Sequence, residues 1–600
     1  MWLINVSTLS LGEFYGADLP SYAILSHTWG AEEVSFQEFV KANDGSDNAA
    51  AITTKAGYRK IIRFCELAQR GGYSYVWVDT CCIDKTSSAE LTEAINSMFR
   101  WYEKSRTCYA YLEDFSSHDM DGQMAQSYLG AGISDHFSAA FRKCRWLTRG
   151  WCLQELLAPR HVLFLDRDWR EIGTRHVLSS LISEITGIPK TLLTTPRRTK
   201  VWNFPIAVRI SWMSKRQTTR VEDMSYSLLG ILGVNLPTIY GEGHEAFMRL
   251  QGEIVRKYSD LSIFAFHLDK PIHGFTPALA HRPQCFPVNP SAGTYNKESH
   301  YFGSWINTQF SLTSRGIVFP NATLRYQKTP ELGHQYLLDL HYRGKGNHQR
   351  YMLLQKIGPG LFLRIHNSPE RQKAFADVAI SSPFSEPVCI LHKVPTSKVT
   401  RARGHWERYA VRLRWKPWEK QGKRFYHIRA AEPRDYWDFA ASQFLIQVAS
   451  PPEMHIQFIP GSYETNPEMK FFVLVIRADN DRKRGARKLE VRVVSADAWR
   501  GVNRSEIGFR GNGISEIPMT EDVSDDSKIS IAGYDMAMSV ELVKDRGWAD
   551  HYCIFLDWEV SDATRGTEEA PEEVNGEVIG AFTAPGDTSP TPAELTRIPA

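Results

Sequence analysis

The chain has 600 residues, of which 42% are hydrophobic and 12% aromatic; this is too much for one core and predicts about two to four domains. Its formal net charge of +3 is close to balance, so charge alone predicts neither a nucleic-acid nor a membrane partner. The nine cysteines contain no CxxC pair, which predicts reduced thiols and no metal site. No signal peptide and no apolar run of ~18 residues is present, so we expect a cytoplasmic protein without a membrane span.

The first 190 residues alternate short apolar strands with amphipathic helices. Strands are predicted within residues 21–30, 75–79, 107–112 and 161–166, and helices within 58–68, 87–98 and 177–185. Ser87 and Glu90 have the spacing of a capping box at a helix start. Strands that alternate with helices in this way predict a parallel sheet with helices on both faces, here a flavodoxin-like α/β domain.

The stretch from Phe141 to Pro159 is predicted to be a basic loop that enters a short amphipathic helix. The apolar side of that helix carries Leu153 and Leu156, and Glu155 lies among these apolar residues. A carboxylate in this position is either solvated on the outer face or held in a pocket for a purpose. The helix alone leaves both interpretations open.

Polar residues follow two of the predicted strands: Ser26, His27 and Trp29 after the first, Asp79 and Asp84 after the second. In parallel sheets the ligand crevice lies outside the carboxyl ends of the strands, so we expect these side chains and Glu155 to meet at one rim. Taken singly, Asp79 is also typical of a strand-end turn and His27 of a loop hydrogen-bonder. The predicted meeting of these side chains at one rim, and not any single residue, is therefore what indicates a functional site.

Beyond residue 190 the pattern changes twice. Residues 191–268 are predicted to form a helical extension, in which Arg197-Arg198 and Lys215-Arg216 are interpreted as solvated faces. Residues 269–561 contain short strands among turn residues, which predicts a β-rich domain, a sandwich or barrel. The predicted strands lie within residues 336–340, 351–354, 361–365, 471–476, 489–494 and 552–556. Residues 562–600 have the composition of a disordered tail.

One stretch of the β-rich part, residues 398–429, is strongly basic and carries three interleaved tryptophans. This pattern is compatible with a nucleic-acid or phosphoinositide surface. Its centre, residues 411–415, alternates apolar and cationic residues, as a strand with one solvated face does. We favour the strand and expect no nucleic-acid function.

Four blocks of the sequence resemble the fungal heterokaryon incompatibility (HET) domain. They are Tyr-Ala-Ile-Leu-Ser-His-Thr-Trp-Gly at 22–30, Tyr-Val-Trp-Val-Asp-Thr-Cys-Cys-Ile-Asp at 75–84, residues 89–102, and Arg-Gly-Trp-Cys-Leu-Gln-Glu-Leu-Leu-Ala-Pro at 149–159. A fifth block, 213–230 with Tyr-Gly-Glu-Gly at 240–243, is similar to the segment that follows this domain in many such proteins. The resemblance covers roughly residues 20 to 265.

The HET domain in turn resembles the TIR domain, and Trp-Cys-Leu-Gln-Glu-Leu at 151–156 is similar to a conserved block of plant TIR domains. In TIR enzymes the Glu of that block is the catalytic residue for NAD cleavage, so the resemblance implies this role for Glu155. The residues expected to bind the substrate are Ser26, His27, Trp29, Gly30, Asp79, Asp84 and Trp151. NAD is expected as a substrate and no cofactor is predicted, because the chain lacks a GxGxxG or Walker loop.

The resemblance implies a role in fungal non-self recognition and programmed cell death, by NAD hydrolysis of the TIR type. The alternative is a signalling module without chemistry, in which the HET domain assembles with copies of itself or with a sensor. In either case the β-rich domain is a candidate for partner recognition.

Overall fold

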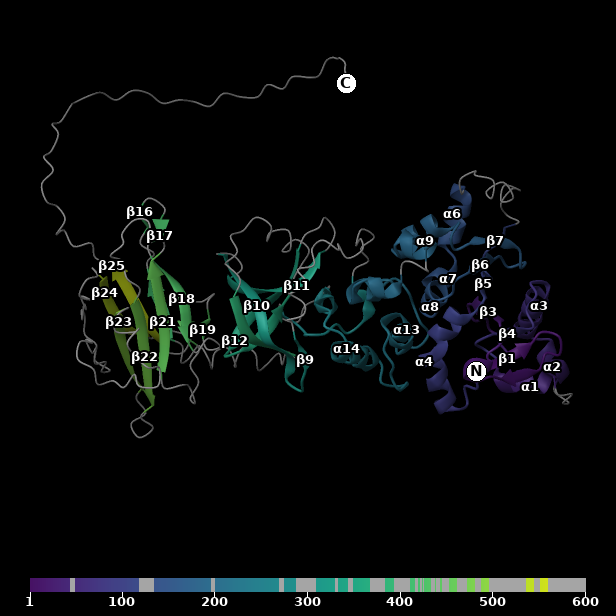
Figure 1. The fold of residues 1–600 in the computed structure, drawn as a ribbon, viewed down its shortest axis with the longest axis horizontal. Helices are drawn as coiled ribbons and strands as arrows, with labels where there is room; N and C mark the ends of the chain where they lie inside the picture. The colour runs from purple at the N-terminus through teal and green to yellow at the C-terminus, as the bar shows by residue number, and fades with distance from the viewer. Residues whose placement is uncertain are drawn as a thin grey trace, which may run out of the picture.

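The computed structural model describes residues 1–43, 49–117, 134–195, 200–268, 275–286, 309–329, 333–343, 349–366 and 384–392, and the strands between residues 411 and 558. An α/β part, a helical part and two β-rich parts follow one another along the longest axis of the molecule (Figure 1). Buried hydrophobic side chains form one continuous cluster from Leu3 to Ile390. The proposed domain boundaries at 190, 268 and 561 remain predictions.

The α/β part is built on a seven-stranded sheet with the order β2-β1-β4-β3-β5-β6-β7. The four central strands β4, β3, β5 and β6 are parallel, as predicted, whereas the edge strands β1, β2 and β7, which the sequence analysis missed, are antiparallel. Every residue of β3 is buried, so it lies at the centre of the layer. The bounds are β1 Trp2–Asn5, β2 Leu11–Glu13, β3 Tyr22–His27, β4 Tyr75–Trp77, β5 Thr107–Tyr111, β6 Val162–Leu165 and β7 Glu171–Thr174.

Helices cover both faces of this sheet, which confirms the predicted layering. Figure 1 shows α3 (Ala56–Arg70) on one side and α4 (Ser88–Lys104), α7 (Arg145–Thr148) and α8 (Cys152–Leu157) on the other. Two short helices, α1 (Phe36–Asn43) and α2 (Ala49–Thr53), precede α3. Gly57 lets α3 approach the preceding loop closely, because a Cβ atom there would lie 2.4 Å from the carbonyl oxygen of Glu32.

The helix start at Ser87 matches half of the predicted capping box. The Ser87 hydroxyl accepts a hydrogen bond from the Glu90 amide at 3.3 Å. The Glu90 carboxylate, however, accepts from the amide of Asp84 at 2.9 Å and not from that of Ser87. The amide of Ser87 instead donates to the carbonyl oxygen of Asp84, so a backbone turn replaces the second hydrogen bond of the capping box.

Replacing Ser87 with Ala is expected to destabilise the start of α4 by about 1 kcal/mol, because the amide of Glu90 loses its acceptor. Hydrogen exchange at the Glu90 amide measures this local effect. Ser88→Ala is the matched control, since Ser88 is the first helical residue and exposed. Equal exchange rates in the two variants would contradict a capping role for Ser87.

The predicted basic loop before Glu155 is wrong, because residues 141–148 are largely helical. Helix α6 (Asp135–Arg142) is followed directly by the single turn of α7. The reason is packing: Phe141 and Trp146 are fully buried and both make edge contacts with Phe164 of β6, at centroid distances of 5.8 and 5.3 Å. The buried aromatic rings anchor both helices, while the cationic side chains between them stay at the surface.

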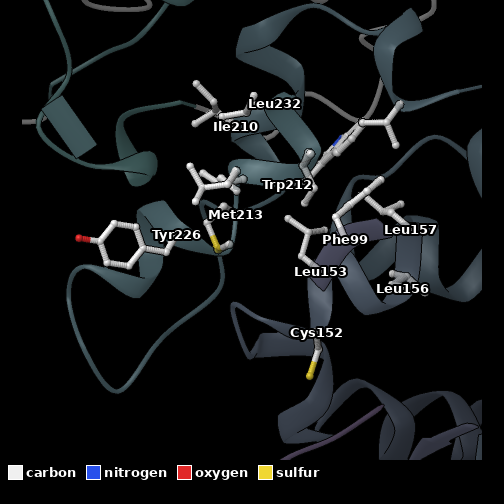
Figure 2. Packing of buried hydrophobic residues seen from close by; sticks show 14 of the residues in the cluster. Phe99, Cys152, Leu153, Leu156, Leu157, Ile210, Trp212, Met213, Tyr226 and Leu232 are labelled. Atoms are coloured by element: carbon white, nitrogen blue, oxygen red, sulfur yellow. The ribbon is translucent and has the colours of Figure 1, made fainter. Parts of the chain in front are cut away.

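Short helices continue to residue 264, as predicted for the helical extension. They are α9 Ser179–Thr186, α10 Lys190–Thr194, α11 Ile206–Ser211, α12 Asp223–Tyr226, α13 Leu229–Leu232 and α14 Glu245–Lys257, with 3-10 turns at Val201–Asn203 and Leu261–Phe264. Two further 3-10 turns lie outside this extension, at Gly16–Asp18 and Pro283–Cys285. Figure 2 shows how they join the α/β part, with Leu153 and Leu157 on the α8 side and Trp212 and Met213 on the other. No helix among the described residues is long and apolar enough to cross a bilayer.

The β-rich region contains a closed five-stranded barrel, so of the two expected architectures, a sandwich or a barrel, the barrel is found here and the preferred sandwich is not. Strands β10 to β14 pair in the circular order β10-β11-β12-β13-β14. Closure is achieved because β10 is 14 residues long and has a register shift between Phe319 and Ala322, so it reaches both β11 and β14. The bounds are β8 Phe275–Thr276, β9 Ser311–Leu312, β10 Gly316–Thr329, β11 Gly333–Arg343, β12 Gln349–Gly358, β13 Leu361–Ile365 and β14 Phe384–Leu391.

The remaining strands form a five-stranded sheet, a four-stranded antiparallel sheet and a two-stranded ribbon. The predicted strand at 411–415 is confirmed as β15, which lies between β20 and β25; the rest of the basic stretch is described only in part. The proposed tail, 562–600, lies outside the described residues. The bounds are β15 Val411–Trp415, β16 Glu419–Lys420, β17 Lys423–Arg424, β18 Tyr426–Glu432, β19 Trp437–Asp438, β20 Gln443–Phe444, β21 Glu453–Pro460, β22 Phe472–Asn480, β23 Arg487–Ser495, β24 Met536–Val543 and β25 His551–Trp558.

Candidate functional site

Glu155 lies in α8 behind the carboxyl end of β3, and it is buried with 5% of its surface exposed. The hydroxyl of Ser26, on β3, donates a short hydrogen bond to its Oε2 atom. The indole Nε1 of Trp146 donates to the same hydroxyl at 2.7 Å. An indole N–H can only donate, so it fixes the Ser26 hydroxyl as an acceptor from Trp146 and a donor to Glu155. The sequence analysis missed Trp146, although it lies in the same basic stretch.

Burial controls the acid–base behaviour of Glu155. Loss of solvent raises its pKa to about 8, and the negative charge of Asp79 adds to this rise. Hydrogen bonds from Ser26 and Cys152 and the positive charge of Arg149 favour the ionised form, so they limit the rise of the pKa. A carboxyl group with such a raised pKa is typical of active sites, although structural networks also produce it.

A second cluster surrounds His27, the residue after Ser26. Side chains alternate along a strand, so His27 points to the opposite face of the sheet from Ser26. Its Nε2 atom lies 2.9 Å from Asp79 Oδ1, and its Nδ1 atom lies 3.9 Å from Glu33 Oε1. Nδ1 is buried and has no hydrogen-bond partner among the residues that the structure describes. Lys60 of α3 forms an ion pair with Glu33 at 2.5 Å, which ties this cluster to the α3 face.

Asp79 joins the loops that follow β3 and β4. In addition to His27, it accepts a hydrogen bond at 2.8 Å from Nε1 of Trp29. Burial opposes its ionisation, but the bonds from His27 and Trp29 and the charge of Lys85 outweigh burial and hold the pKa of Asp79 well below its usual range. Asp79 is therefore a permanent negative charge that acts on Glu155 from the rim of the sheet.

Trp29 is the exposed member of this group, with 39% of its surface accessible. The ammonium group of Lys85 lies 4.0 Å from the ring centroid, and the guanidinium of Arg149 lies 5.9 Å from it. Two cations thus already lie within cation–π distance of the indole ring, and Lys85 is the closer. Neither Lys85 nor Arg149 was singled out from the sequence, because each looks like an ordinary surface cation.

Three predicted site residues, Gly30, Asp84 and Trp151, have structural partners outside the bonds described so far. The amide of Gly30 donates to Glu33 at 2.7 Å, so this glycine closes the loop beside His27. Asp84 accepts from the amide and hydroxyl of Thr86 at 2.9 and 2.6 Å, as a turn residue does. The side chain of Trp151 hydrogen-bonds to Asp223. The structure therefore links Ser26 to Glu155 and links Asp79 to His27 and Trp29, whereas Asp84 and Trp151 take part in none of these bonds.

The sequence predicts that Glu155 faces a ligand crevice at the rim of the sheet, but its side chain is buried, with 5% of its surface exposed. Behind α8 lies Arg216, which is 2% exposed and donates to the carbonyl oxygen of Arg149 at 2.8 Å. The prediction of a solvated Lys215-Arg216 face is therefore wrong for Arg216, while Arg197-Arg198 lies outside the described residues. Burial lowers the pKa of Arg216 to about 10.

The segment after α11 is paired with the start of α8. The amide of Gly150 donates to Gln217 O at 2.8 Å, and the amide of Gln217 donates to Thr148 O at 2.7 Å. A Cβ atom at position 150 would lie 2.4 Å from Thr218 Cγ2, so any other residue would require the Thr218 side chain to shift. The fifth sequence block thus holds the helix that carries Glu155. No group of three or more His, Cys, Asp or Glu side chains within the described segments is arranged to hold a metal ion.

Residues 22–155 match the family model described as heterokaryon incompatibility protein (HET). A stretch of 240 residues, 39% of the chain, is 48% identical to vegetative incompatibility protein HET-E-1 of Podospora anserina, and it spans 16% of the length of that relative. No solved structure matches the chain. The two sequence matches confirm the resemblance to the HET domain, which includes every site residue named above from Ser26 to Glu155.

Proposed function

We propose, from the HET-domain match, that this chain is an effector of fungal heterokaryon incompatibility that causes cell death by cleaving NAD, with Glu155 as the catalytic carboxylate. The observation that carries the proposal is the chain of hydrogen bonds from Trp146 through Ser26 to the buried Glu155. The name of the related protein HET-E-1 supports the incompatibility role. The chemistry rests on the TIR-like sequence Trp-Cys-Leu-Gln-Glu-Leu.

The strand order supports a flavodoxin-like or TIR-like assignment for the α/β part. Numbered along the chain, the parallel strands β4-β3-β5-β6 have the order 2-1-3-4, as in the first four strands of the flavodoxin arrangement. Ser26 is the last residue but one of β3, beside the point where the strand order reverses, and ligands of such sheets bind outside this point. The antiparallel β7 departs from the pattern, because a fifth parallel strand stands there in flavodoxin-like sheets.

The proposed reaction is hydrolysis of the bond between nicotinamide and ribose, in which water supplies a hydroxyl to the ribose carbon and a proton is released. Nicotinamide departs as a neutral molecule from a cationic ring, so no acid is needed to protonate it. A single carboxylate beside the ribose then stabilises the developing positive charge. Trp29 can stack the cationic nicotinamide ring only if that ring displaces Lys85 or Arg149, or uses a part of the indole that neither cation covers.

The raised pKa of Glu155 gives this proposal a pH signature. Only the ionised form stabilises a cation, so kcat/KM for NAD is expected to rise with pH and to level off above about 8. A bound cationic nicotinamide favours the carboxylate form of Glu155, so the pH profile of kcat is expected to have its midpoint at a lower pH than the profile of kcat/KM. Nicotinamide release by the purified protein, followed between about pH 6 and pH 9, tests both. No release, or a flat profile, would contradict the proposal.

Burial of Glu155 also favours the second candidate function, a signalling module without chemistry. The carboxyl group is 5% exposed and lines neither of the two cavities described below. In that case the buried network only stabilises a domain that assembles with copies of itself or with a sensor. Growth arrest on expression with unchanged cellular NAD would establish this function and exclude the first.

A further inference from the structure

A large cavity lies at the opposite edge of the sheet from Glu155. Its volume is about 1030 Å³, and its walls include Tyr22 at the start of β3, Arg106 before β5 and Ala158 after α8. A neighbouring cavity of about 610 Å³ shares Arg160 and His161 with it. Cavities of several hundred Å³ are large enough for a nucleotide-sized ligand.

The walls of the larger cavity carry a local excess of positive charge. They contain four cations, Lys104, Arg106, Arg160 and Lys200, and one carboxylate, Glu103. The whole chain has a net charge of only +3, so this excess is a property of the cavity. The ion pairs found within the described residues involve none of the four cations. Arginine guanidinium groups bind phosphate oxygens in a bidentate manner.

The negative end of helix α8, which borders this cavity, is neutralised by a buried arginine. Arg175 is 3% exposed and donates to Leu156 O at 2.5 Å and to Arg160 O at 3.1 Å. Leu156 O belongs to the last turn of α8, where unpaired carbonyl oxygens would otherwise repel an anion, and Arg160 O lies in the segment that follows the helix. The wall formed by Leu157 and Ala158 therefore does not oppose the charge of a phosphate group.

The same cavity has one exposed aromatic wall. Trp202 is 46% exposed, although it belongs to a short turn anchored by the buried Val201. One side of its ring packs on Phe99 at a centroid distance of 6.0 Å, which holds it in place. A fixed and half-exposed indole beside cations offers a stacking surface for an aromatic ring.

We infer that this cavity is a binding site for a nucleotide, whose base stacks on Trp202 and whose phosphates contact Arg106 and Arg160. The cations alone would suit any anion, and the indole alone any aromatic molecule. Together they fit a ligand that carries both groups. The inference does not depend on NAD cleavage, because Glu155 lines neither cavity.

The test is a titration of the full-length protein with mant-ATP, a fluorescent ATP derivative, followed by fluorescence anisotropy. Saturable binding is expected, and ATP should compete, whereas adenosine or inorganic phosphate at equal concentration should not. Arg106→Gln combined with Arg160→Gln, and separately Trp202→Ala, should each weaken binding by about tenfold or more. Trp202→Tyr should restore most of the affinity lost in Trp202→Ala, because it keeps an aromatic ring.

Two controls separate this site from the rest of the molecule. Arg63→Gln removes an exposed arginine of α3 and should leave binding unchanged. Glu155→Gln should also bind mant-ATP normally, so failure of the NAD proposal leaves this one intact. Absence of saturable binding, equal affinity in folded cavity variants, or equal competition by inorganic phosphate or by an RNA oligonucleotide would overturn the inference. Circular dichroism establishes that each variant is folded.

Discussion

Replacing Glu155 with Gln is expected to lower the rate of NAD cleavage by on the order of 10²-fold or more, because it removes the charge that stabilises the ribosyl cation. Gln keeps the shape of the side chain and an oxygen that can accept the hydrogen bond from Ser26. The change therefore separates chemistry from folding. Release of nicotinamide by purified protein and growth arrest on expression are the two measurements.

A matched control for this variant is Glu66→Gln, which removes the same charge from an exposed position on α3. Its NAD cleavage and toxicity should equal those of the parent. If folded Glu155→Gln still cleaves NAD and arrests growth as the parent does, Glu155 is not the catalyst. If the parent arrests growth while NAD stays intact, the signalling function replaces the enzymatic one.

The sequence predicted the parallel layer well because its strands are short, mostly apolar and separated by helices with strong periodicity. Residues 22–27 and 75–77 form central strands as expected, and Ser26 and Asp79 follow from their positions at strand ends. The edge strands carried no comparable signal. Trp2–Asn5 and Glu171–Thr174 pair antiparallel at the margins, and their pairing depends on tertiary neighbours more than on pattern.

The sequence predicted which residues belong to the candidate site better than it predicted how they are arranged. Residue spacing indicates that Ser26 and His27 lie near each other, but strand alternation separates them onto two faces, so only Ser26 reaches Glu155. Burial of Arg216 could not be predicted, because a Lys-Arg pair in a polar segment is typical of a surface. The enclosure of Glu155 likewise depends on packing between α8 and a segment some sixty residues further along the chain.

The raised pKa of Glu155 also has a consequence for stability that does not depend on any substrate. Its pKa is about 8 in the folded protein against an ordinary value of 4.5, so between these values the unfolded chain ionises this group while the folded chain keeps it protonated. Ionisation therefore favours unfolding, and the loss of stability grows as pH rises from about 4.5 to about 8, then stays constant. A pKa difference of this size is equivalent to several kcal/mol at most.

Glu155→Gln abolishes this titration, so the stability of the variant relative to the parent is expected to increase with pH. The difference in Tm should be smallest near pH 5 and largest above about pH 8, with a change of a few degrees between them. Thermal melting of both proteins across this range measures it, and the slope with pH is informative even if Gln packs slightly better or worse than Glu. Glu66→Gln, at an exposed position, should show no such slope. A constant Tm difference between pH 5 and pH 8.5 would mean that Glu155 ionises normally in the folded protein, and the expected rise of NAD cleavage toward pH 8 would lose its physical basis.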